Sequence, residues 1–369
     1  MRKSIDRPLL ILLGILILTG FLIFSSASLG LLSRGGARFS SVAFNQIFFG
    51  IIGGTIALTI TANVHYRFWR KYAFYLIIAA LIVTALVFTP LGMAHGGARR
   101  WIALGSFSFQ PAEILKFAFI IYIATWLSGM QKYVATFKRG LLPFCGMLAF
   151  VGVILLLQPD TDTYAIMAVS ALAMFVTAGG RWRDVVATGL VGLIIILSLA
   201  FFRPHIRDRL TTFIHPSNDP QGKSWQVKQS LIAIGSGGMF GRGFGQSIQK
   251  FEYLPEPIGD SIFAVLGEEF GFLGTTSLIV LFCLFTLRGF RIATESTDMF
   301  GMLLVVGFIT LIMLQVFLNI GAMIAVAPLS GLPLPFISHG GTALLSTLAS
   351  VGIILNVSRY SKKRIAKGT

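Results

Sequence analysis

Charged residues are scarce in this sequence. Asp, Glu, Lys and Arg make up only 12% of the 369 residues, whereas 55% are hydrophobic. A soluble protein carries roughly twice that share of charge. Apolar runs of about 20 residues, long enough to cross the hydrocarbon core of a bilayer, recur along the whole chain. The composition leaves no room for a separate soluble domain, and it predicts one all-α polytopic membrane domain over residues 1–369.

Cysteine and cleavable leader signals are also nearly absent. Cys145 and Cys283 are the only cysteines, and both lie inside apolar runs, where a thiol packs as a small core residue. No disulfide is expected. The first apolar run follows a short basic start and contains no Ala-x-Ala cleavage site, so it is interpreted as a retained helix and not as a signal peptide.

Acidic residues are outnumbered, with 14 Asp and Glu against 30 Lys and Arg and a net charge of +16. An excess of this kind also occurs in proteins that bind nucleic acid. In a membrane protein, however, Lys and Arg collect at the cytoplasmic ends of the helices. Because the chain is so apolar, we favour the membrane interpretation and expect no nucleic-acid partner.

The apolar segments predict ten transmembrane helices, with boundaries accurate to a few residues. An even number of spans places both termini on one side of the membrane. The long connection at about 203–260 and the segment 325–340 then lie on the other side. The predicted spans are 8–29, 43–62, 72–93, 110–129, 140–158, 163–180, 186–202, 261–287, 299–324 and 341–358.

The orientation follows from counting Lys and Arg loop by loop. The short loops away from the termini hold only Arg34, Arg38, Arg99 and Arg100. By the positive-inside rule, both termini are therefore cytoplasmic and the long loop is extracytoplasmic. The basic residues on the side of the termini are Arg2, Lys3, Arg7, Arg67, Arg70, Lys71, Lys132, Lys138, Arg139, Arg181, Arg183, Arg288, Arg291, Arg359, Lys362, Lys363, Arg364 and Lys367.

Two outer segments predict a cavity. Residues 235–245 are rich in glycine, which permits tight turns and close backbone approach to a ligand, but they do not end in the Gly-Lys-Ser/Thr of a Walker A loop. Pro328, Pro333 and Pro335 interrupt the outer end of the ninth span. Irregular backbone at this depth is stable only where protein buries it or water lines it. We therefore expect a cavity open to the outer side.

Ionisable residues near the outer ends of the spans are candidates for a site in this cavity. Glu113 and Lys116, one helical turn apart, form either a self-contained pair or part of a polar cavity. Asp160 and Asp162 suit either a divalent-cation site or a solvated turn.

The densest acidic group of the outer side is formed by Glu252, Glu256 and Asp260. Asp260 directly precedes the eighth span. It is therefore a candidate both for the N-cap of that helix and for a proton-transferring acid or base. The N-cap position would keep its pKa low through the helix dipole, which makes a weaker base.

Basic residues of the outer side complement these acids. Lys116 is a candidate partner for Glu268 or Glu269, which follow two turns deeper in the eighth span. Arg and Lys bind pyrophosphate, and an acid transfers a proton, so the set suits a phosphorylated, lipid-borne substrate without specifying the reaction. The basic residues near the outer interface are Arg99, Arg100, Arg203, Arg207, Arg209, Lys223, Lys228, Arg242 and Lys250.

Seven motifs, in order along nearly the whole chain, resemble those of the FtsW/RodA (SEDS) family. Three segments, 97–101, Asp219–Gly222 and 247–255, resemble the division branch, FtsW, more than the elongation branch, RodA. The motifs are Gly97-Ala-Arg-Arg-Trp-Ile102, Phe109-Gln-Pro-Ala-Glu-Ile-Leu-Lys116, Gln158-Pro-Asp160, Gln229–Gly238, Gln249–Glu256, Asp260–Glu269 and Pro333–Gly341.

The resemblance implies an enzyme that polymerises lipid II into glycan strands on the outer face of the bacterial cytoplasmic membrane. The implied reaction is an inverting glycosyl transfer with undecaprenyl pyrophosphate as leaving group. Asp260 matches the family's essential acid, as a base or as the ligand of a divalent cation (Mg or Mn) for which Asp160 is a second possible ligand. The implied substrate-binding residues are Arg99, Arg100, Glu113, Lys116, Asp160, Lys250, Glu252, Glu256 and Ser338.

The same resemblance implies partners and a cellular role. The partners are a class B penicillin-binding protein, which is a transpeptidase, together with divisome proteins and membrane lipid, and the role is septal synthesis in cell division. Two other functions stay open: a lipid II flippase and a non-catalytic scaffold for the penicillin-binding protein. Polar residues concentrate in the outer half of the spans, which favours the enzyme over a flippase.

The chain departs from the family pattern at several motif positions. Ala112 and Asp162 stand where serine and glycine are usual, and His339 stands where tyrosine is usual. Ile258-Gly259 replaces His-Thr before Asp260, so a histidine beside this acid is not required. Asp162 either changes the cation preference or faces solvent.

Overall fold

The computed structural model describes residues 5–32, 42–95, 98–104, 107–214 and 223–361. Within these ranges, nine helical segments are long and apolar enough to cross a membrane, and the shorter apolar helix α7 (Thr161–Thr177) occupies the position of the predicted sixth span. The prediction of a polytopic helical protein is confirmed. The nine segments are α1 (Arg7–Leu32), η1 with α3 (Asn45–Gly53 and Gly54–Asn63), α4 (Tyr66–Ala85), α5 (Pro111–Gly129), η3 with α6 (Phe137–Leu141 and Leu142–Leu157), α8 (Trp182–Phe202), α12 (Ile262–Thr294), α13 (Met299–Met323) and α14 (Gly341–Arg359).

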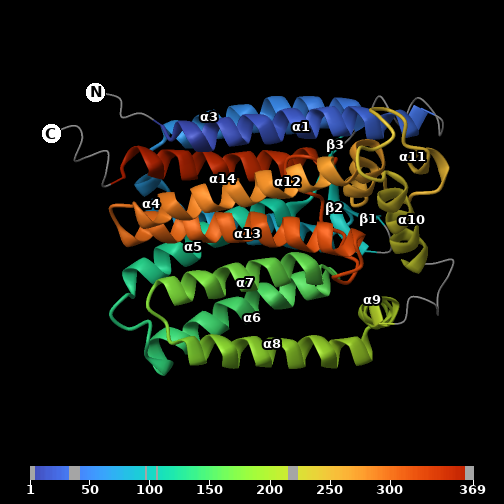
Figure 1. The fold of residues 1–369 in the computed structure, drawn as a ribbon. Coiled ribbons are helices and arrows are strands. Elements are labelled where there is room, and N and C mark those ends of the chain that lie inside the picture. The colour runs from blue at the N-terminus through green and yellow to red at the C-terminus, as the bar shows by residue number, and fades with distance from the viewer. Residues whose placement is uncertain (1–4, 33–41, 96–97, 105–106, 215–222, 362–369) are drawn as a thin grey trace.

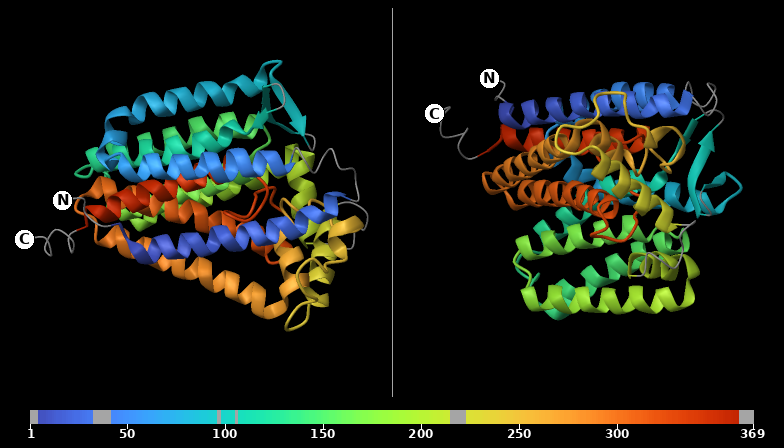
Figure 2. Two further views of the ribbon diagram at one scale, coloured as in Figure 1. Left: turned by 90° about the horizontal axis from the view of Figure 1, so that it is seen from above. Right: turned by 45° about the vertical axis from the view of Figure 1, so that its right-hand side comes forward.

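The long helices run side by side, so that α1 begins and α14 ends at the same end of the bundle (Figure 1). The opposite end carries the short helices α9 (Pro204–Ile214), α10 (Lys223–Ser236) and α11 (Gln249–Glu252), together with three strands. The two turned views in Figure 2 show the strands and short helices at this same end. We refer to it as the loop end.

The strands form a small antiparallel sheet that the all-α prediction did not include. Its order is β1 (Gly92–His95), β2 (Ala98–Leu104) and β3 (Phe107–Phe109). The predicted third span ran to residue 93, but helical structure ends earlier, and Thr89 is extended (φ −86°, ψ 173°). A proline follows this residue, and proline disfavours helical backbone in the residue before it.

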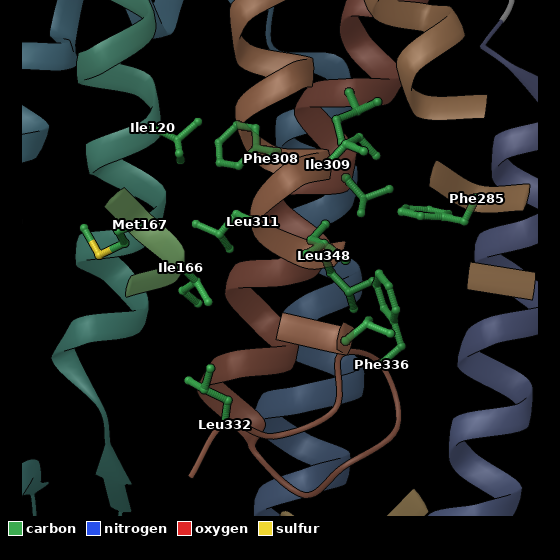
Figure 3. Packing of buried hydrophobic residues seen from close by; sticks show 14 of the residues in the cluster. Ile120, Ile166, Met167, Phe285, Phe308, Ile309, Leu311, Leu332, Phe336 and Leu348 are labelled. Atoms are coloured by element: carbon green, nitrogen blue, oxygen red, sulfur yellow. The ribbon is translucent and has the colours of Figure 1, made fainter. Parts of the chain in front are cut away.

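The core lies where α5, α7, α13 and α14 pack against one another. Figure 3 shows Ile120, Met167 and Phe308 in this core. Leu332 and Phe336, from the irregular segment between α13 and α14, are also buried, at 3% and 4% exposure. Protein therefore covers much of this segment, which is one of the two ways in which irregular backbone is stable at membrane depth; the cavity expected from the sequence stays a prediction.

The glycine-rich segment 235–245 packs along α12. The main-chain N–H groups of Phe272 and Leu273 donate to carbonyls at Gly238 (2.8 Å) and Met239 (3.1 Å). At the same level, Gly271 interrupts α12 with φ of +64°, a conformation that favours glycine. The glycines therefore allow the segment to approach a helix main chain, whereas the sequence suggested approach to a ligand.

Candidate functional site

Asp260 lies at the loop end, two residues before the first residue of α12. Its main-chain carbonyl accepts a hydrogen bond from Nδ2 of Asn319 (2.9 Å), a fully buried residue of α13. The same amide group donates to the carbonyl of Leu332 (2.8 Å). One side chain thus joins the approach to α12 with the irregular segment between α13 and α14.

The two residues before Asp260 are hydrogen-bonded to the irregular segment between α13 and α14. The main-chain N–H of His339 donates to the carbonyl of Ile258 (2.7 Å), and Oγ of Ser338 donates to the carbonyl of Gly259 (2.7 Å). Ser338 also accepts a hydrogen bond from the main-chain N–H of Leu334 (2.8 Å). The predicted site residue Ser338 therefore contacts main chain on both sides.

The side chain of Asp260 does not cap α12, so the N-cap interpretation was wrong: the N-cap residue is Ser261. The carboxylate instead lies beside Gly331. A Cβ atom placed on Gly331 would lie 3.9 Å from Oδ2 of Asp260 and 3.9 Å from Nη2 of Arg209. Nη1 of Arg100 lies 4.0 Å from the same point. An acid before α12, one arginine of α9 and one of β2 therefore surround a position that has no side chain.

The environment of Asp260 favours its protonated form. Its pKa is raised from 3.8 to about 7, chiefly by burial and then by the negative charges of Glu256 and Asp162. The positive charges of Arg209 and Arg100 act in the opposite direction. A carboxylate with a pKa near 7 suits general base catalysis at neutral pH, because it is a stronger base than an ordinary aspartate and is still ionised in part.

Asp160 is almost fully buried, at 1% exposure, next to this cluster. It lies 3.6 Å from Nη1 of Arg100 and accepts a hydrogen bond from the side-chain amide of Gln110 (3.3 Å). Arg100 also donates to the carbonyl of Pro159. Burial raises the pKa of Asp160, and Arg100 opposes that shift. Asp160 and Arg100 therefore form one wall of the site.

Asp162 is not a free solvated turn. Its Oδ2 atom pairs with Nη1 of Arg209 (2.6 Å) and accepts a hydrogen bond from the main-chain N–H of Gly331 (3.2 Å). The sequence assigned neither Arg209 nor Asp162 to substrate binding, although Arg209 was one of the outer basic residues and Asp162 a candidate for a cation site or a solvated turn.

Glu113 and Lys116 form a buried ion pair at 2.8 Å, but the pair is not self-contained, because each member also bonds to another helix. Lys116 also donates to Oε1 of Gln315 (3.2 Å), and Gln315 donates to the carbonyl of Pro333 (2.8 Å). Glu113 accepts a hydrogen bond from Ser346 of α14 (2.9 Å). The pair is therefore linked, through Gln315, to the irregular segment that lies against Asp260.

Lys250 lies away from this cluster and is fully buried. Its ammonium group pairs with Glu269 (2.7 Å) and donates to Oγ of Ser26 in α1 (3.0 Å). Glu268 accepts hydrogen bonds from Oγ of Ser247 (2.6 Å) and is paired with Arg242 (3.5 Å). The expectation that Lys116 pairs with one of these two glutamates was therefore wrong.

The remaining candidates are placed as follows. Arg99 precedes Arg100 on β2, so its side chain points to the opposite face of the strand, and it is exposed. Glu256 is exposed and lies near enough to Asp260 to influence its pKa. Glu252 ends α11, and its side chain lies outside the described residues.

A dedicated cation site does not fit the residues present. Among the described residues, no three His, Cys, Asp or Glu side chains are grouped as a metal ion requires. Arg209 and Arg100 lie about as near the open point beside Asp260 as its carboxylate does, and the neighbouring acid Asp162 is already paired with Arg209. Asp160 faces Arg100.

Sequence reasoning did not single out Gln315 and Asn319. Both are buried polar residues in an otherwise apolar span, spaced four apart so that they lie on one face of α13. Because an amide inside a membrane must find internal partners, this spacing was a usable signal for a segment that packs against the helix.

The helices and the charged cluster define a multi-pass membrane protein with an acid and two guanidinium groups at one end of its bundle. The chain belongs to the FtsW, RodA and SpoVE family of cell cycle proteins, whose family model matches residues 7–363. It is 40% identical to stage V sporulation protein E of Bacillus subtilis over 372 residues, which cover 98% of this chain and 99% of that protein. It is 37% identical to a probable peptidoglycan glycosyltransferase FtsW of Geobacter sulfurreducens over 365 residues, which cover 98% and 97%.

Solved structures have the same fold. A chain of a peptidoglycan synthase complex, described as coordinating polymerization and crosslinking, superposes with a TM-score of 0.78 at 26% identity. The match covers 98% of this chain and 99% of that one. The rod shape determining protein RodA of Thermus thermophilus superposes with a TM-score of 0.69 at 26% identity and covers 97% and 98%.

Proposed function

We propose that this protein is a peptidoglycan glycosyltransferase that polymerises lipid II. The observation that carries the proposal is the cluster at the loop end, where Asp260, with a pKa near 7, lies beside the guanidinium groups of Arg209 and Arg100. The cluster combines a base for a hydroxyl proton with cations for a departing diphosphate. Family membership, and relatives that bear this activity in their names, support the same reaction.

In the proposed reaction, a hydroxyl oxygen of the acceptor sugar attacks the anomeric carbon of the donor and forms the new glycosidic bond. The bond from that carbon to the diphosphate breaks, and undecaprenyl pyrophosphate leaves with the electron pair. Asp260 accepts the hydroxyl proton. Attack from the face opposite the leaving group inverts the configuration. Arg209 and Arg100 stabilise the charge that develops on the diphosphate.

We infer that α7 also crosses the membrane, as the sixth of ten spans, and that the loop end lies on the outer side of the bacterial cytoplasmic membrane. Basic residues at the other end of the bundle, such as Arg70, Lys138 and Arg183, support a cytoplasmic location for that end. The diphosphate of a donor anchored by its lipid in the outer leaflet would then reach the cluster at the level of the lipid head groups.

For the cellular role, we propose septal synthesis together with a class B penicillin-binding protein and divisome proteins. A division protein and a sporulation protein are among the relatives, and a peptidoglycan synthase complex is among the structures of the same fold. Expression of this chain in cells depleted of their own FtsW tests the role, since a septal enzyme restores division. Continued filamentation despite normal membrane expression would contradict it.

Polymerisation in a purified system tests the activity. The protein and its cognate penicillin-binding protein are given lipid II in detergent, and glycan strands are resolved by gel electrophoresis. Asp260→Asn preserves the shape of the side chain but removes the base, so we expect the rate to fall by about 10²–10⁴-fold. Asp208→Asn is the matched control, because Asp208 is an exposed acid of α9.

The outcomes separate the three functions. Polymer formed equally well by the parent and by Asp260→Asn contradicts the assignment of Asp260. Transbilayer movement of lipid II in proteoliposomes, without polymer, supports a flippase. If only the penicillin-binding protein responds, through a gain in transpeptidation that Asp260→Asn leaves intact, the chain is a scaffold.

A further inference from the structure

The carboxylate of Asp162 occupies a position built from hydrogen-bond donors. Its Oδ2 atom lies 2.6 Å from Nη1 of Arg209 and 3.2 Å from the main-chain nitrogen of Gly331. The side chains of Arg209 and Asp162 are only 20% and 17% exposed, so the pair is largely shielded from water. The carboxylate is therefore a resident anion at the edge of the site, next to Asp260.

A guanidinium group and a main-chain N–H are the donors with which proteins commonly bind phosphate oxygens. Arg100 adds a second guanidinium group to this position, since its Nη1 atom and Nη2 of Arg209 lie at 4.0 Å and 3.9 Å from one point beside Gly331. Nε of Arg100 is buried and makes no hydrogen bond within the described part of the chain. Arg209, Arg100 and Gly331 therefore offer more N–H donors at this position than the carboxylates of Asp162 and Asp160 engage.

Asp162 lies in the first turn of α7, at a motif position where the family pattern has glycine. Glycine would leave Arg209 and the N–H of Gly331 without this anion. The negative charge in this position is thus a property of this chain and not a requirement of the surrounding fold.

We propose that Arg209 and the N–H of Gly331 form a diphosphate subsite, and that the Asp162 carboxylate is an internal competitor that a diphosphate must displace from Arg209. The proposal rests on the proposed function for the identity of the ligand, the diphosphate of a lipid-linked donor or product. Asp162 then weakens binding of both and shortens the time for which the released lipid diphosphate occupies the site.

Binding of two probes, inorganic pyrophosphate and undecaprenyl pyrophosphate, to the purified full-length protein in detergent tests the competition. We expect Asp162→Asn and Asp162→Gly to bind both probes about fivefold to tenfold more tightly than the parent, as for loss of a partly shielded ion pair. Arg209→Gln should bind both weakly. Asp208→Asn, the neighbouring exposed acid, should bind like the parent.

A double-mutant cycle separates competition for Arg209 from a general change of charge. If Asp162 acts through Arg209, Asp162→Asn gains affinity in the parent but not in the Arg209→Gln background. An equal gain in both backgrounds, or no gain in either, overturns the proposal. Tighter binding of undecaprenyl pyrophosphate alone would also overturn it, because the effect would then belong to the lipid chain and not to the diphosphate.

The binding cycle tests the competition and the polymerisation assay tests the proposed function, so each can be contradicted without the other. Binding of pyrophosphate needs no turnover, so a coupled cycle in a protein that makes no polymer would support the competition and contradict the proposed function. Polymerisation that depends on Asp260, with no coupling between Asp162 and Arg209, would do the reverse. Thermal unfolding of each variant shows that it is folded, and Asp162→Gly replaces Asp162→Asn if the latter is not.

Discussion

The buried amide of Asn319 donates to the main-chain carbonyl of Asp260 at 2.9 Å and to that of Leu332 at 2.8 Å. A residue of α13 thus determines where the acid stands relative to the irregular segment that carries Gly331. Both amide hydrogens are used, while Oδ1 is buried without a partner in the described structure. The cost of burying that oxygen is offset by two bonds that fix the site.

The first prediction concerns this amide. Asn319→Leu retains approximate volume but leaves the buried carbonyl of Leu332 and the partly buried carbonyl of Asp260 without this donor, so we expect a loss of about 1–3 kcal/mol in stability. Polymerisation should fall through kcat more than through KM, because Asp260 shifts while the arginines remain. The control is Asn63→Leu, since Asn63 is exposed at the other end of the bundle. Equal effects of the two variants on kcat would contradict a positioning role.

The second prediction is a pH profile. The rate should rise with pH through about 7 as Asp260 loses its proton, since only the carboxylate accepts one from the acceptor hydroxyl. Glu256 raises this pKa and Arg209 lowers it, so Glu256→Gln should move the acidic limb to lower pH and Arg209→Gln to higher pH. Initial rates measured from about pH 5 to about pH 9 give the profile of the parent and the shift in each variant. Shifts of the opposite sign would contradict the electrostatic account.

The third prediction concerns Lys250, for which sequence resemblance suggested substrate binding. The structure pairs it with Glu269 in a fully buried contact, so Lys250→Met should cost about 3–5 kcal/mol by leaving a buried carboxylate unpaired. Adding Glu269→Gln should restore much of that stability. Thermal unfolding in detergent gives the stability of the parent, the two single variants and the double variant. The control is the more exposed Arg291–Glu295 pair, whose disruption should cost only about 0–1 kcal/mol. A raised KM with unchanged unfolding would instead support direct contact with substrate.

The fourth prediction links the site to stability. The pKa of Asp260 is about 7 in the folded protein, above its ordinary 3.8, so ionisation opposes folding. The penalty is absent below about pH 3.8, grows as pH rises and is complete above about pH 7. Asp260→Asn should therefore unfold at a higher temperature than the parent at pH 8, with the difference shrinking toward pH 4. A constant difference across this range would contradict the shift.

Much of the fold could be predicted because it depends on chain-wide hydrophobicity. Segments of about 20 apolar residues have few alternatives to a membrane-spanning helix, and most predicted spans agree with helices within a few residues. The strand pair at Met93 and Trp101 was missed because short strands carry weak periodicity. The end of the third span was placed too late, although Pro90 marked it.

The site was predictable only where position along the chain implies position in space. Asp260 lies at a helix start and was placed correctly at the loop end. Lys250 pairs with Glu269 and Arg209 pairs with Asp162, and both pairs join segments that lie apart in the sequence. The spacing of residues along the chain does not predict such pairs. A basic residue in an outer loop is equally compatible with a ligand contact and with a buried ion pair.

The way in which residues 258–260 are held has a consequence for sequence variation. His339, Ser338 and Asn319 bind the carbonyls of these residues and not their side chains. A main-chain carbonyl is present whichever amino acid carries it. The hydrogen bonds that hold the acid therefore do not depend on which side chains stand at positions 258 and 259, although the side chain of Ile258 itself is buried in the hydrophobic core, at 7% exposure. A saturation library should find position 259 permissive, position 258 restricted to side chains that can be buried, and position 260 nearly invariant.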